Sequence, residues 1–91
     1  MRTESKLANE VAHLANEYHS ERITLRSEGS IIFSRENEIT VRKKADFIKF
    51  VCMKNGEIMD WELNVHQSTR SETIAHTILA LEGFRLSPEA A

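Results

Sequence analysis

The chain has 91 residues, of which 41% are hydrophobic and 29% charged, and its formal net charge is -2. This length provides one modest hydrophobic core and leaves no room for a second domain. The single Pro and three Gly are too few for an intrinsically disordered chain. No apolar run approaches the roughly 18 residues of a membrane span, and the first residues lack the apolar segment of a signal peptide. With Cys52 as its one cysteine, we expect a cytoplasmic protein without an internal disulfide.

The net charge conceals an uneven distribution along the chain. Residues 1–21 carry two basic and four acidic side chains, residues 22–54 carry eight and four, and residues 55–91 carry two and six. The middle third is therefore basic and both flanks are acidic. Such a division indicates either a basic binding face or packing between segments of opposite charge.

The first segment has the pattern of an amphipathic helix. Thr3 is the expected N-cap, and the helix is predicted to end between Tyr18 and Ser20. Its apolar residues recur with the 3.6-residue period of one helix face: Leu7, Val11, Leu14 and Tyr18.

The segment from Arg22 to about residue 66 has the alternating pattern of strands, interrupted by short polar breaks. It predicts five antiparallel strands. Asn55-Gly56 is the strongest short hairpin signal and predicts a two-residue type I′ turn. A three-residue loop ending at Gly29 and a four-residue loop over residues 43–46 are predicted for two of the other connections.

The Asn55-Gly56 turn also predicts the register of the last hairpin. With Lys54 opposite Glu57, three apolar pairs share one face: Cys52 with Met59, Phe50 with Trp61, and Ile48 with Leu63. The other face then holds Lys49 opposite Glu62, a favourable cross-strand pair. Extended to the remaining strands, the pattern predicts this buried face: Ile23, Leu25, Ile31, Phe33, Ile39, Val41, Ile48, Phe50, Cys52, Met59, Trp61 and Leu63.

A second helix is predicted at the end of the chain. Thr69 and Glu72 have capping-box spacing, and Gly83 is the expected C-terminal stop. The sequence therefore predicts an α+β two-layer sandwich over residues 1–86. In it, an N-terminal and a C-terminal helix cover one face of a five-stranded antiparallel meander. Residues 87–91 are predicted to form a flexible tail.

No sequence motif indicates catalysis or metal binding. His13, His19, His66 and His76 have no metal-ligand spacing, so we expect neither a metal nor a cofactor. Cys52 is predicted on the buried face, without the electropositive surroundings that activate a thiol. The chain also has no GxSxG, Walker or GxGxxG motif.

The informative surface is the predicted outer face of the sheet. It collects more apolar residues than a solvated face needs: Ile32, Phe47, Val51, Met53 and Ile58. Clusters of exposed apolar residues mark interaction sites. This pattern predicts a protein interface, formed either with a second copy in a homodimer or with a different protein.

Basic residues in the middle third give an alternative. They predict a platform around Phe47 for single-stranded nucleic acid, formed by Arg22, Arg26, Arg42, Lys43, Lys44 and Lys49. Such platforms stack bases on several aromatic rings, and this face offers one. Glu38, Asp60 and Glu62 on the same predicted face would also repel phosphates.

We therefore expect a small non-enzymatic interaction protein, such as an adaptor, a regulator or a stoichiometric inhibitor. It would bind a protein partner through the outer sheet face or through the acidic helix surfaces, without a membrane. Binding of single-stranded nucleic acid is the first alternative, and a small-molecule enzyme is the second.

Overall fold

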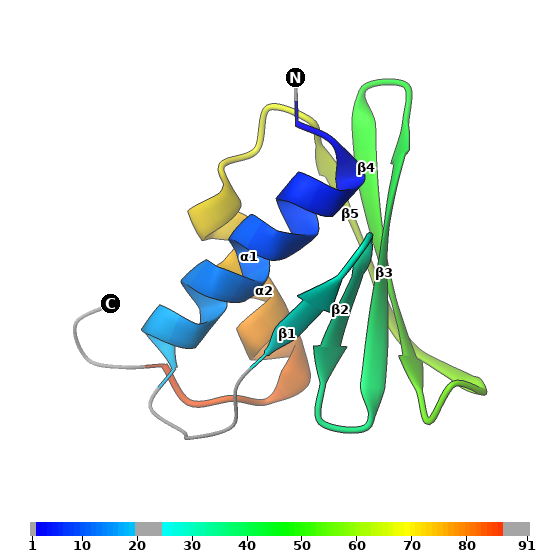
Figure 1. Cartoon of the computed structure of the whole chain (residues 1–91), viewed down its shortest axis with the longest axis vertical. Helices are drawn as coiled ribbons and strands as arrows, with labels where there is room; N and C mark the ends of the chain where they lie inside the picture. The colour runs from blue at the N-terminus through cyan, green and yellow to red at the C-terminus, as the bar shows by residue number, and fades with distance from the viewer. Residues whose placement is uncertain (1, 20–24, 87–91) are drawn as a thin grey trace.

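A computed structural model of the chain describes residues 2–19 and 25–86. They form one sheet and two helices (Figure 1). The elements are α1 Glu4–Tyr18, β1 Arg26–Glu28, β2 Ile31–Ser34, β3 Asn37–Lys44, β4 Phe47–Lys54, β5 Ile58–His66 and α2 Ser71–Glu82. The predicted α+β architecture is confirmed. The predicted tail, and the predicted positions of Arg22 and Ile23, lie outside the described residues.

The sheet has the strand order β1-β2-β3-β4-β5, and every neighbouring pair is antiparallel. Both helices lie on one face of this meander, which we call the inner sheet face (Figure 1). In the part of the chain that the structure describes, no element covers the opposite face, which we call the outer sheet face. None of the described helices is long and apolar enough to span a membrane.

Local signals determine where α1 begins. The Thr3 hydroxyl accepts a hydrogen bond from the Lys6 backbone N–H at 3.1 Å, as predicted for an N-cap. The helix buries one face against α2 and the first three strands, with Leu7, Ala8, Val11, Ala12 and Ala15 buried. Three of these residues are alanine, whose small side chains allow a helix to pack close to its neighbours.

The two ends of α2 differ in how well the sequence predicts them. Gly83 has a φ of 78° and closes the helix with a hydrogen bond from its N–H to Ala80, as predicted. The capping box predicted at Thr69 is wrong, because the N-cap is Arg70 and makes no side-chain cap. The Thr69 N–H instead donates to the His66 carbonyl, which turns the chain out of β5 before the helix starts.

The first three hairpins all have two-residue turns, at positions 29–30, 35–36 and 45–46. The three-residue and four-residue loops predicted from sequence are therefore wrong. Arg35 and Ala45 have φ angles of 57° and 55°, in the region that turns usually reserve for Gly or Asn. Two of the tight turns thus lack the residues that identify such turns in a sequence.

The shorter first turn reverses the two faces of β2. Ile32 and Ser34 are buried on the inner sheet face, and Ile31 and Phe33 lie on the outer sheet face. The prediction had these residues the other way round. A change of one residue in register moves every side chain of a strand to the opposite face.

The last hairpin keeps its predicted turn conformation but not its predicted register. Asn55 and Gly56 both have positive φ, as a type I′ turn requires. Glu57 adds a third turn residue, so that Lys54 pairs with Ile58. A bulge next to Cys52 adds one further residue on β5.

The true register of this hairpin is therefore shifted by two residues. Cys52 pairs with Trp61, Phe50 with Leu63, and Ile48 with Val65. An even shift keeps Trp61 and Leu63 on the inner sheet face, as predicted. Met59, which was predicted to be buried, is instead 57% exposed.

Candidate functional site

The outer sheet face is the candidate site, and its apolar residues come from three strands. They are Ile31, Phe33, Phe47, Val51, Met53 and Met59. Met53 pairs directly with Met59 across β4 and β5. Phe47 is 50% exposed, and the Val51 and Met53 side chains are half-buried. Among residues 2–19 and 25–86, no helix or strand covers these side chains.

The structure places three of the five predicted interface residues on this face. Phe47, Val51 and Met53 lie there. Ile32 does not: it is 0% exposed and belongs to the core. Ile58 is 67% exposed but pairs with Lys54, so strand alternation puts it on the other side of the hairpin tip from Met59.

The sequence analysis missed Ile31, Phe33 and Met59 as members of the site. All three were predicted on the buried face because the turn lengths were misjudged. Phe33 is partly shielded by Arg26, whose guanidinium carbon lies 4.6 Å from the ring centroid. The signal that would have located Ile31 and Phe33 is a two-residue turn at Gly29-Ser30.

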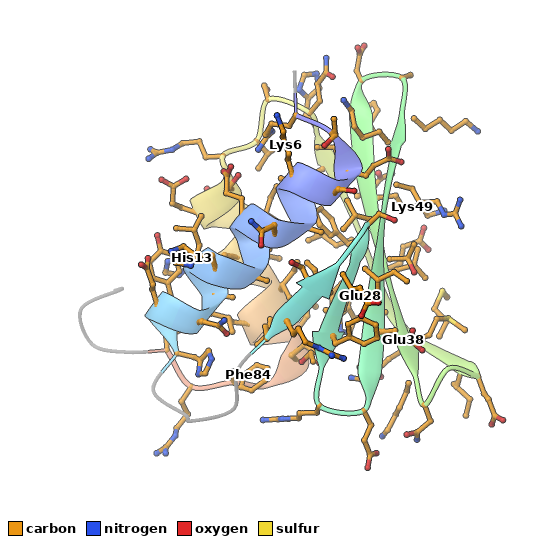
Figure 2. The ribbon with its side chains drawn as sticks, in the orientation of Figure 1. Lys6, His13, Glu28, Glu38, Lys49 and Phe84 are labelled. Carbon is orange, nitrogen blue, oxygen red and sulfur yellow. The ribbon has the colours of Figure 1, made fainter. Side chains whose placement is uncertain are left out.

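Charge on the outer sheet face is divided along the strands. The basic end carries Arg42, Lys44 and Lys49, with Asp46 in the adjoining turn. The acidic half carries Glu28 and Glu62, which are level with Thr40, and Glu38 one row further on, where Arg26 lies on the edge strand. Figure 2 shows Lys49 toward one end of the sheet, and Glu28 and Glu38 toward the other.

One ion pair joins the basic end to the acidic half. Lys49 Nζ lies 2.7 Å from Glu62 Oε1, so the predicted Lys49–Glu62 pair forms. The two residues are not directly opposite, because Lys49 pairs with Asn64 and Glu62 pairs with Val51. The contact is therefore diagonal across β4 and β5.

The structure brings together three of the six basic residues of the nucleic-acid hypothesis, because Arg42, Lys44 and Lys49 lie near Phe47 at the basic end. Lys43 points to the helix side, where its Nζ donates to the Arg2 carbonyl at 2.8 Å. Arg26 stacks on Phe33, Lys49 pairs with Glu62, and Arg22 is outside the described residues. Of the four members on the outer sheet face, Arg26 and Lys49 make these contacts and Arg42 and Lys44 do not.

A shallow hollow of about 320 Å³ lies at the basic end of the outer sheet face. Phe47 lines it beside Lys44, Lys49 and Asn64. The Phe47 ring meets the His66 ring edge-on, with centroids 5.7 Å apart. The hollow thus combines an exposed aromatic surface with two ammonium groups.

A larger hollow, of about 600 Å³, lies at the start of α1. Its cations are Arg2, Lys6 and Lys43, with Glu10 among them. Arg2 already donates to the carbonyls of Gln67 and Thr69, and Lys43 to the carbonyl of Arg2. These contacts anchor the chain before α1 to the turn after β5.

The inner sheet face contains a polar cluster centred on Glu82, in the last turn of α2. This carboxylate is 8% exposed. It accepts hydrogen bonds from Ser34 Oγ at 2.7 Å, Trp61 Nε1 at 2.7 Å and Asn37 Nδ2 at 3.0 Å. The Cys52 thiol donates to it at 3.4 Å. The sequence analysis missed this role, because a Glu beside a helix-ending glycine is usually exposed.

Cys52, Asp60 and Glu82 bring potential metal ligands within 4.8 Å of one another. Asp60 was predicted on the outer face, and the bulge turns it toward this cluster. Burial raises the pKa of the Cys52 thiol to about 12, and the negative charge of Glu82 adds to the effect. Since both carboxylate oxygens of Glu82 accept hydrogen bonds and the thiol keeps its proton, the cluster is a hydrogen-bond centre.

The four histidines have separate surroundings. His13 is exposed and lies 3.5 Å from Glu17. His19 is buried and stacks on Phe84 at 5.1 Å, and His76 packs on Tyr18. The ring of His66 contacts Ser68 and Phe47. The described histidines therefore share no site.

Comparison of the chain with protein-family models, curated proteins and solved structures finds no match.

Proposed function

We propose that the protein is a non-enzymatic cytoplasmic interaction protein that binds a protein partner through the outer sheet face. One observation carries the proposal: two helices cover one face of the sheet, and the opposite face presents apolar side chains to solvent, with Phe47 50% and Met59 57% exposed. A sheet with one face in water normally alternates apolar and polar residues between its faces. The outer face of this sheet carries six apolar residues among its charged ones.

The exposed apolar residues are close enough to act together. Strand pairing aligns Ile31 with Val51 across Thr40, and Phe33 with Met53 across Glu38. Met59 extends the second row to the edge. Full burial of one such side chain is worth about 1.5–3 kcal/mol, before the loss of freedom on association is subtracted. A partner that covers both rows gains several such contributions.

The mixed charge of the face favours a protein over a nucleic acid. Phosphates would meet Glu28, Glu38 and Glu62 as well as the lysines. Protein interfaces combine apolar side chains with charged residues of both signs, and the outer sheet face offers both.

Capture experiments with two matched variants test the proposal. Val51→Glu places a charge in the centre of the outer sheet face, and Leu81→Glu makes the same kind of change on α2, where Leu81 is 43% exposed. We expect tagged wild type and Leu81→Glu to capture the same protein from an extract of the source organism, and Val51→Glu to lose it. Circular dichroism should show that all three are folded.

Equal capture by Val51→Glu and wild type contradicts the proposal. Loss confined to Leu81→Glu also contradicts it and moves the interface to the helix layer. A labelled single-stranded oligonucleotide, added at low salt, checks the alternative class of partner, since such binding weakens steeply as salt rises.

A further inference from the structure

We infer that the partner of the outer sheet face is a second copy of this chain, turned end for end. The basic end of one copy would then lie on the acidic half of the other. This inference rests on the proposed function and names its partner. It is carried by the charge pattern of β3 and by the size of the face.

The central strand β3 carries opposite charges on the two sides of Thr40. Glu38 and Arg42 share the outer sheet face with Thr40, since all three alternate with the buried Ile39 and Val41. They are four residues apart, which is about 13 Å along a strand and too far for an ion pair within one copy. Neither takes part in the ion pairs that the described residues form.

A two-fold axis that runs across the strands near Thr40 exchanges these two charges. It sets Glu38 of each copy opposite Arg42 of the other. It also places the centre of one copy's apolar surface against the centre of the other's. The same axis sets Glu28 and Glu62, which are level with Thr40, opposite their own counterparts, and Glu62 is already paired with Lys49. A two-fold axis along the strands would instead set Glu38, Arg42 and Lys44 on themselves and Glu28 on Glu62. Because this second axis brings more like charges together, the charge pattern favours the first arrangement.

The size of the outer sheet face fits a reversible dimer. With strands about 4.8 Å apart and 3.3 Å per residue, the five strands cover about 500 Å². Two copies would bury about 1,000 Å², which is the lower limit of specific interfaces. The edges of the sheet are less suitable for pairing with another copy. β1 has three residues, and β5 is interrupted by the bulge at Asp60.

Sedimentation velocity over about 5–200 µM at low and high salt tests the inference. We expect a dimer that forms with rising concentration and weakens as salt is added. Arg42→Glu and Glu38→Arg should each raise the dissociation constant at least about tenfold. The double variant E38R/R42E restores opposite charges across the proposed axis and should return the constant to within about threefold of wild type.

Glu17→Arg, on the exposed side of α1, is the matched control and should leave the dimer unchanged. Wild type that stays monomeric over the whole range overturns the inference. In that case the comparison of Val51→Glu with Leu81→Glu in capture experiments still decides the proposed function separately. A dimer that Val51→Glu leaves unaffected would have its interface elsewhere, and this result also overturns the inference. Failure of the double variant to restore association overturns the end-for-end arrangement.

Discussion

Adjacent residues of β4 belong to two different surfaces of the same sheet. Phe50 is 0% exposed beneath the helices, and Val51, one residue later, lies half-buried on the outer sheet face. The inner sheet face supplies part of the core and the donors to the buried Glu82 carboxylate of α2. The outer sheet face supplies apolar residues, one diagonal ion pair and charges of both signs. The difference indicates that one face maintains the fold while the other is available for binding.

The largest expected difference between the two sheet faces is in the stability loss caused by truncating Phe50 or Val51 on β4. Phe50→Ala removes the largest fully buried side chain and should lower the free energy of unfolding by about 3–5 kcal/mol. Val51→Ala should lower it by less than about 1 kcal/mol, because the side chain has no second layer to pack against. Urea denaturation at low protein concentration measures both. Similar losses would mean that the two faces do not differ in their contribution to folding.

A second prediction concerns the polar part of the inner sheet face. Glu82→Ala leaves Ser34, Trp61 and Asn37 without their common acceptor. We expect a loss of about 2–3 kcal/mol in unfolding free energy, because buried donors would lack partners. Urea denaturation followed by Trp61 fluorescence reports on it. Glu72→Ala, in the first turn of the same helix, should cause a clearly smaller loss. An equal loss in the two variants would contradict a structural role specific to Glu82.

The third prediction follows from the raised pKa of the Cys52 thiol, about 12 against an ordinary 9.0. Above pH 9 the unfolded chain releases a proton that the folded chain retains. The stability that Cys52 provides is therefore complete below pH 9 and falls as pH rises toward 12, by up to about 1.4 kcal/mol per pH unit. Denaturation of wild type and Cys52→Ala between pH 8 and about 10.5 tests it. Identical slopes would show that the thiol ionises equally in both states.

The smallest effect is expected for Lys49 and Glu62 on the outer sheet face. A double-mutant cycle with Lys49→Gln and Glu62→Gln should give a coupling of about 0.2–1 kcal/mol, because both partners are solvated. The coupling should shrink as salt is added. A value comparable to the Glu82 effect would show that this ion pair contributes to the fold like an inner-face contact.

Much of the fold is predictable because its signals are local. The Thr3 cap and the Gly83 stop each depend on a few neighbouring residues, and the structure confirms both. The hairpin registers, in contrast, are not determined by a few neighbouring residues. Arg35 and Ala45 adopt positive φ without the glycine or asparagine that would have revealed tight turns, and no residue type identifies the bulge at Asp60.

The same distinction explains which site residues were found. The register errors on β3 and β4 were even, so Phe47, Val51 and Met53 stayed on their predicted face. On β2 the error was odd, so Ile32 and Phe33 exchanged faces. Glu82 could not be identified from its own segment, since its donors lie up to 48 residues away.

The position of Glu82 restricts the orientation of α2 on the sheet. A carboxylate in the last turn of a helix faces the negative end of the helix dipole, so it is unfavourable there without compensation. Donors from β2, β3, β4 and β5 supply that compensation. A rotation of α2 by one residue, about 100°, would carry the carboxylate away from its donors and would also displace the buried apolar residues of the helix. A buried charge therefore restrains the rotation of this helix in addition to its apolar face.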